Sequence, residues 1–175
     1  MIQRFFTSTG ELNPWGQRVT KIVARVYALA IVLMCFLPQS VYPNLKDFTT
    51  PGIIQIGRVF FLPTPFNTLV HANHIETIGD FFLILAQNVT NVFLLYPLVL
   101  CLVFLFPSWR NWKRVLRNTF YMSLGIEFTQ LILDLLIDAG RVVEVDDLWT
   151  NSLGGLLAYW TYLMAMKFVQ NKKIG

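Results

Sequence analysis

The sequence predicts an all-α integral membrane protein with four transmembrane helices and a partly structured outer segment between the first two. Of its 175 residues, 55% are hydrophobic and only 14% are charged, whereas an average globular chain has about 25% charged residues. A soluble domain of this size could not cover its surface with so few charges. The composition therefore excludes an ordinary cytosolic enzyme and a disordered chain, and the length fits a single domain over residues 1–175.

Four apolar runs are long enough to cross a bilayer. The hydrocarbon core is about 30 Å thick, so a spanning helix needs about 20 mostly apolar residues. The expected helices cover residues 19–37, 81–106, 115–137 and 147–168. Pro97 lies inside the second of these and is expected to kink it, because proline removes a backbone donor.

The charged residues are segregated between the two sides of these helices. One side carries a single acid, Glu11, together with eleven of the 14 Lys and Arg residues: Arg4, Arg18, Lys21, Arg25, Arg110, Lys113, Arg114, Arg117, Lys167, Lys172 and Lys173. Such an excess of cations marks the cytoplasmic side. We therefore expect a multi-pass plasma-membrane protein with both termini in the cytoplasm. The basic balance then reflects topology rather than nucleic-acid binding, and the bilayer is the first partner.

The proline-rich segment 38–79 is expected on the outer side. Within it, residues 57–70 (GRVFFLPTPFNTLV) are too apolar for a solvated loop. This stretch is expected to lie in the interface or to fold back onto the helices, as a short strand or a re-entrant piece.

The third span carries a polar stripe. At about 100° per residue, five polar residues fall on one face of an otherwise apolar helix: Ser123, Glu127, Gln130, Asp134 and Asp138. Glu127 lies about 15–18 Å from the inner end at a rise of 1.5 Å per residue. An ionisable group at such a depth is costly and indicates a functional site.

Two other spans repeat this pattern in their outer halves. The polar residues are Asp80, Gln87, Asn88 and Asn91 on the second span, and Asp147 and Asn151 on the fourth. Deeper on the fourth span, Gly154, Gly155 and Ala158 would let another helix approach closely. Because lipid cannot satisfy polar groups, we expect the three helices to enclose an outward-facing polar cavity. Its floor would lie near Glu127, and its rim would be formed by Arg141, Glu144, Asp146 and Asp147.

Several spaced motifs resemble the VanZ-like family. The stretch from Arg141, R-V-V-E-V-D-D-L-W-T-N-S-L-G-G, resembles the family pattern R-x-x-D-x-x-D-L-x-x-N-x-x-G, with Glu144 in place of the first Asp. The other matching residues are Ile126, Glu127 and Gln130 on the third span, Asn91, Leu94, Pro97 and Leu98 on the second, and the pair Pro65 and Phe66. Val99 stands where the family usually has glycine. The resemblance implies a small bacterial four-helix membrane protein, and the founding member lowers susceptibility to the antibiotic teicoplanin.

The functional expectation is a cell-envelope protein of VanZ type that lowers susceptibility to lipoglycopeptides such as teicoplanin. Its cavity would engage a lipid-linked cell-wall component or the antibiotic itself. The residues expected to line the site are Asn91, Glu127, Gln130, Arg141, Asp146, Asp147 and Asn151. No catalytic residue or cofactor is identified.

Simpler interpretations stay open for the same residues. Glu127, Gln130 and Asn151 would also serve as interhelical hydrogen-bond partners, worth about 0.6–2 kcal/mol each. Arg141 would either pair with the nearby acids or clamp a phosphate.

Two other functions are compatible with the carboxylates. One is a Mg²⁺-dependent enzyme acting on a polyprenyl phosphate headgroup. The other is an ion-coupled transporter that uses Glu127, Asp134 and Asp138. A zinc site is not expected, because His71 and His74 would lack further ligands.

Overall fold

Four long helices and a small sheet make up the computed structural model, which describes residues 5–7, 10–41, 51–70 and 77–171. The helices are α1 (Pro14–Phe36), α3 (Ile78–Leu105), α4 (Trp112–Ile137) and α5 (Val145–Asn171). The shorter elements are the 3-10 turns Gln39–Val41 and Pro107–Trp109, the strands β1 (Ile54–Ile56), β2 (Val59–Leu62) and β3 (Val142–Glu144), and the short helix α2 (Asn67–Val70).

Three of the long helices, α1, α3 and α4, contain segments long and apolar enough to cross a membrane. The fourth expected span corresponds to α5, which is 27 residues long but carries Asp146 and Asp147 in its first turn. The fold is therefore mostly helical and of multi-pass membrane type. Hydropathy supports three spans among the described residues, one fewer than the four expected, and α5 is the helix that it does not support.

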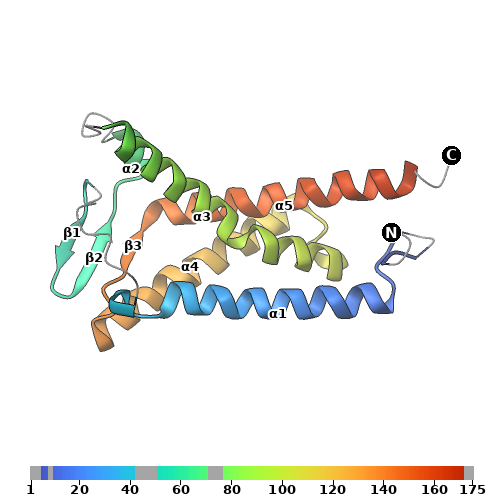
Figure 1. Ribbon diagram of the computed structural model, residues 1–175, viewed down its shortest axis with the longest axis horizontal. Helices are drawn as coiled ribbons and strands as arrows, with labels where there is room; N and C mark the ends of the chain where they lie inside the picture. Colours follow the sequence, from blue (N-terminus) through green and yellow to red (C-terminus); the bar gives the residue numbers. More distant parts are fainter. Residues whose placement is uncertain (1–4, 8–9, 42–50, 71–76, 172–175) are drawn as a thin grey trace.

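The long helices alternate in direction. The start of α1, the end of α3, the start of α4 and the end of α5 lie toward one end of the bundle, and the sheet lies at the other (Figure 1). The cations Arg18, Lys21, Arg110 and Lys113 belong to the first end. We call this the basic end, and the opposite one the sheet end.

Large apolar side chains cover the outside of the bundle. Val26 is 64% exposed, Leu136 72% and Met164 63%, and they come from three different helices. The interior between the helices is also apolar, with Leu95, Val99, Val103, Val115 and Ala158 almost completely buried. An apolar exterior of this extent fits a lipid environment.

Glycines set the close packing of α5. A Cβ on Gly154 would overlap the backbone carbonyl of Val92 on α3, and a Cβ on Gly155 would overlap Thr119 on α4. The expected close approach is thus confirmed at Gly154 and Gly155, and Ala158 is completely buried. α5 is the central helix, because it packs against both α3 and α4.

Pro97 lies within α3, which continues on both sides of it. Since proline has no N–H, the carbonyl four residues earlier, that of Phe93, loses its helical donor. The Tyr27 hydroxyl of α1 lies beside this gap, 3.5 Å from Phe93 O and 3.1 Å from Leu94 O. α3 also changes direction along its length in Figure 1, as the proline predicts.

The outer segment forms part of a three-stranded sheet of order β1-β2-β3. β1 and β2 form an antiparallel hairpin, and β2 pairs in parallel with β3, with Phe61 opposite Val143. The strand expected within residues 57–70 is thereby confirmed as β2. Its partner β3 directly precedes α5, so the sheet ties the outer segment to the start of that helix.

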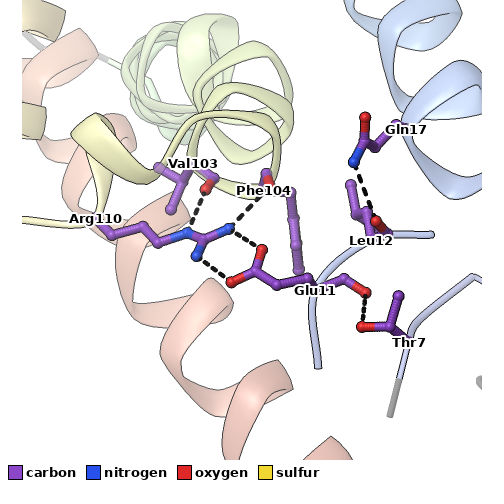
Figure 2. Close-up of polar contacts among 7 residues, drawn as sticks. All are labelled: Thr7, Glu11, Leu12, Gln17, Val103, Phe104 and Arg110. Atoms are coloured by element: carbon purple, nitrogen blue, oxygen red, sulfur yellow. Dashed lines mark hydrogen bonds and ion pairs between the residues drawn. The ribbon is translucent and has the colours of Figure 1, made fainter. Parts of the chain in front are cut away.

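At the basic end, Arg110 joins the N-terminal segment to α3 and α5 (Figure 2). Its guanidinium forms a two-pronged ion pair with Glu11 at 2.6 Å and donates to the carbonyls of Val103 and Phe104, in the last turns of α3. The guanidinium also lies 5.5 Å from the centre of the Tyr162 ring of α5. The hydrogen bonds from Arg110 lower the pKa of Glu11. We call this arrangement the arginine clamp.

Candidate functional site

Three carboxyl groups meet between the helices toward the sheet end. Glu127 comes from α4, Glu144 from the end of β3 and Asp147 from the first turn of α5. Gln87 and Asn91 of α3 donate amide hydrogens to Glu144 and Asp147, respectively. We call these five residues the carboxylate cluster.

Glu127 lies at the centre of the carboxylate cluster. Its side chain is 5% exposed, and its Oε2 accepts a hydrogen bond of 2.8 Å from the backbone N–H of Glu144. Its Oε1 is buried and has no conventional hydrogen-bond donor among the described residues. Glu127 and Asp147 are close enough to hydrogen-bond to each other. Because an ionised carboxylate only accepts hydrogen bonds, that bond requires a proton on one of them.

Asp147 connects the carboxylate cluster to a polar layer beneath it. Its Oδ1 accepts from Asn91, and its backbone carbonyl accepts from the Ser123 hydroxyl at 3.0 Å. The Ser123 hydroxyl in turn accepts from Asn151 Nδ2 at 2.9 Å. Asn151 Oδ1 is buried without a hydrogen-bond donor among the described residues. Glu127 Oε1 and Asn151 Oδ1 are thus two buried acceptors without a conventional donor among the described residues.

Glu144 has an unusual environment for a carboxyl group outside the long helices. Its Oε1 lies 3.3 Å from Gln87 Nε2, and Asp147 and Asp146 are its charged neighbours. Burial, followed by repulsion from Asp147 and then Asp146, raises the pKa of Glu144 to about 8. Glu144 therefore takes up a proton more readily than an ordinary glutamate.

Arg141 turns toward the end of α1. Its guanidinium donates to Leu37 O at 2.6 and 2.9 Å, to Met34 O at 2.7 Å and to Gln39 Oε1 at 3.2 Å. These carbonyls lie at the C-terminus of α1, where helix geometry leaves acceptors unpaired and a cation is favoured. Arg141 would have to leave these contacts in order to clamp a phosphate.

Asp146 holds the turn before α2. Its two oxygens accept from the backbone N–H groups of Phe66 and Asn67, at 2.6 and 2.8 Å. Phe66 has a positive φ of 54°, which is uncommon for a residue with a bulky side chain. The carboxylate of Asp146 therefore stabilises a strained turn and links the outer segment to α5.

Gln130 and Asp134 continue the polar stripe of α4 toward the sheet end. Gln130 donates to Cys35 O of α1 at 3.1 Å, and Asp134 accepts from the Arg141 N–H at 2.9 Å. Cys35 is one residue from the end of α1. Gln130 therefore lies level with the last turn of α1, and Glu127 lies about one helical turn before it on α4.

The predicted site residues thus divide into two groups. Asn91, Glu127, Asp147 and Asn151 lie in or directly beneath the carboxylate cluster, whereas Gln130, Arg141 and Asp146 fasten neighbouring segments. The seven expected site residues did not include Glu144, Gln87 or Ser123, although Glu144 was expected at the rim of the cavity and the other two on its polar stripes. A signal for all three was present, since Glu144 belongs to the Arg141 motif and the other two to polar stripes.

The described residues contain no group of three or more His, Cys, Asp or Glu residues arranged to hold a metal ion. His71, His74 and the side chain of Asp80 lie outside the described residues. Cys35 and Cys101 are free thiols.

Comparisons with known proteins identify the family. A family model described as VanZ/LLP1 matches residues 24–167. No curated protein and no solved structure matches the chain. The matched range contains the carboxylate cluster and all the motifs around Asn91, Glu127 and Arg141. The chain therefore belongs to the VanZ/LLP1 family.

Proposed function

We propose that this protein is a bacterial cell-envelope protein that lowers susceptibility to lipoglycopeptide antibiotics such as teicoplanin. It would act by engaging a lipid-linked cell-wall component, or the antibiotic itself, at the carboxylate cluster. Family membership supports a VanZ-type role. The observation that carries the proposal is the buried Glu127 Oε1, which has no conventional donor among the described residues although its neighbours are polar.

The chemistry of the cluster indicates the kind of group it would bind. Glu127, Glu144 and Asp147 present carboxyl oxygens, and the Gln87 and Asn91 amides already donate to two of the three residues. Glu127 Oε1 still needs a donor, either the proton shared with Asp147 or a group on a bound molecule. An ammonium, an amide or a hydroxyl group of a wall precursor or glycopeptide would supply it, because a buried acceptor without a donor costs about 1–3 kcal/mol.

The proposed membrane arrangement has four spans with both termini in the cytoplasm. The alternation of the long helices supports it, since α1 starts and α5 ends toward the same end of the bundle (Figure 1). The cations of the loop between α3 and α4 lie at that end too, as the positive-inside rule requires of a cytoplasmic surface. The carboxylate cluster would then lie toward the outer leaflet, where wall precursors and glycopeptides are accessible.

The test is the minimal inhibitory concentration of teicoplanin, with vancomycin as a second glycopeptide, in a sensitive Gram-positive host. The strains would express wild type, Glu127→Gln, Asp147→Asn or Glu11→Gln at matched membrane levels. Glu11→Gln is the control, because it makes the same kind of change in the arginine clamp. Wild type and Glu11→Gln should raise the inhibitory concentration of teicoplanin, and the two cluster variants should not.

Two results would contradict the proposal. Absence of protection by well-expressed wild type would separate this protein from the resistance phenotype. Equal protection by wild type and both cluster variants would place the activity elsewhere in the molecule.

A second candidate is proton-coupled transport, which the proximity of Glu127 and Asp147 favours. Two carboxyl groups that share a proton are a common feature of proton pathways in membranes. In proteoliposomes, transport would change the fluorescence of a pH dye trapped inside the vesicles. The change should require an imposed proton gradient and should be lost when Asp147 is substituted. Protection that persists when the proton gradient is collapsed would favour binding instead.

A further inference from the structure

A groove of about 440 Å³ lies on the surface between α4 and α5, and none of its lining residues belongs to the carboxylate cluster. Its lining consists of Trp112, Lys113, Leu116, Arg117, Phe120 and Tyr121 of α4, with Trp149 and Ser152 of α5. The volume falls within the range of ligand pockets, roughly 300–1,000 Å³. The lining has two chemical parts, a cationic end and an aromatic wall.

The cationic end is formed by Lys113 and Arg117. They are four residues apart on α4 and so lie on the same face. Both are exposed, and neither has an acidic partner in the part of the chain that the structure describes. By contrast, Arg114, between them in the sequence, does not line the groove and donates to Ser108 O at 3.3 Å.

The aromatic wall continues from these cations along the bundle. Phe120 and Trp149 lie with their ring centres 6.4 Å apart, and Tyr121 and Trp149 are 62% and 55% exposed. The Lys113 ammonium lies 5.5 Å from the centre of the Trp112 ring. Tryptophan near the end of a spanning helix is typical of the level of the lipid headgroups.

We propose that this groove is a specific binding site for an anionic phospholipid of the cytoplasmic leaflet. The headgroup phosphate would lie against Lys113 and Arg117, and an acyl chain would follow Phe120, Tyr121 and Trp149. The charges are complementary, and the groove begins at the basic end of the bundle, where the positive-inside rule places the cytoplasmic surface. Long cationic side chains reach from an apolar surface to the headgroup region. The occupant is independent of the function proposed for the carboxylate cluster.

The test uses the full chain reconstituted in vesicles that contain brominated lipid, which quenches tryptophan fluorescence on contact. Two of the five tryptophans, Trp112 and Trp149, line the groove. The quantity measured is the relative association of brominated phosphatidylglycerol over brominated phosphatidylcholine. Wild type should prefer the anionic lipid, with about a fivefold contribution from each cation at low salt. The preference should decrease as salt is added.

The variants are Lys113→Gln, Arg117→Gln and the double substitution, with Arg114→Gln as the matched control. Each single groove variant should lose about fivefold of the preference, the double variant should lose nearly all of it, and Arg114→Gln should keep it. These side chains are exposed, so the variants are expected to fold, which circular dichroism would check.

Equal association of both lipids with wild type would overturn the proposal. So would a preference that survives the double substitution or is lost equally in Arg114→Gln, because binding would then follow total charge. As a second readout, native mass spectrometry should find an anionic lipid retained by detergent-extracted wild type and released from the double variant.

Discussion

Two polar regions of this bundle are built from similar side chains and differ in charge balance. In the arginine clamp, the carboxylate of Glu11 faces a guanidinium that also caps α3. In the carboxylate cluster, three acids meet amide donors and one another. The clamp leaves its acid half-exposed, since the Glu11 side chain is 50% accessible, whereas Glu127 is 5% exposed.

The difference indicates what each region does. A carboxylate paired with arginine near water has its bonding satisfied within the chain and serves to hold segments together. Buried carboxyl groups without a matching cation are costly to maintain, so their presence points to a proton or ligand that completes them. The arginine clamp fastens segments of the chain, and the contrast supports the binding role proposed for the carboxylate cluster.

The largest effect on stability should come from a substitution that separates α5 from α3 beside the carboxylate cluster. Gly154→Ala would place a methyl group against Val92 O, next to Asn91, which donates to Asp147. Because the new methyl group would overlap the backbone of Val92, which cannot rotate away, α3 and α5 must separate. We expect a loss of about 3 kcal/mol in the free energy of unfolding. Thermal unfolding in detergent would measure it.

Gly125→Ala is the control for that substitution. Gly125 is also helical, but nothing lies within 4 Å of the position of its Cβ. Alanine there should be neutral or should stabilise by up to about 1 kcal/mol through helix propensity. Equal destabilisation by the two substitutions would show that the α3–α5 contact is not the cause.

The next largest effect is the change in stability with pH that Glu144 causes. Its pKa is raised to about 8 in the fold, so above the pKa of an unfolded glutamate the folded state holds the extra proton. Stability from this group is complete below the unfolded pKa, and it is lost as pH rises toward and through about 8. Wild type should therefore show a melting temperature that falls over this range.

Glu144→Gln removes the titrating group while retaining an acceptor for Gln87. Its melting temperature should fall less than that of wild type between pH 5 and pH 8. Parallel pH profiles for the two proteins would contradict a Glu144 that holds a proton in the folded state.

The smallest effect is expected at the arginine clamp. Glu11→Gln should cost about 0.5–1 kcal/mol, as for a well-oriented surface ion pair. Since Arg110 lowers the pKa of Glu11, the contribution is present above the unfolded pKa and is lost as pH falls through the lower, folded value. Its pH dependence is thus opposite to that of Glu144.

A double-mutant cycle with Arg110→Gln, measured at low and high salt, would isolate the pair. The coupling should weaken with salt because the pair is partly exposed. A coupling larger than the cost of Gly154→Ala would reverse the order of these two effects, and a coupling unchanged by salt would contradict a partly exposed ion pair.

Much of the cluster could be predicted from side-chain periodicity. Glu127, Asn91, Asp147 and Asn151 lie on the polar faces of their helices, and polar faces in an apolar bundle must meet. Arg141 and Asp146 could not be assigned in this way. Arg141 lies in the connection before β3, where no helical period fixes its direction, and Asp146 lies in the first turn of α5, facing away from the cluster toward the outer segment. Their partners are 104 and 80 residues away in the sequence.

The sequence by itself determined the membrane class, the long apolar helices, the segregation of charge and the family motifs, because these depend on composition and on local periodicity. Only the tertiary structure decided which polar groups are satisfied. It directs Arg141 to the end of α1 and Asp146 to the Phe66 turn, and it leaves Glu127 Oε1 without a conventional donor among the described residues. The physical reason is that hydrogen bonds act over about 3 Å, so their partners depend on how closely the helices approach and how they are rotated. Those distances are set here by contacts such as Gly154 against Val92.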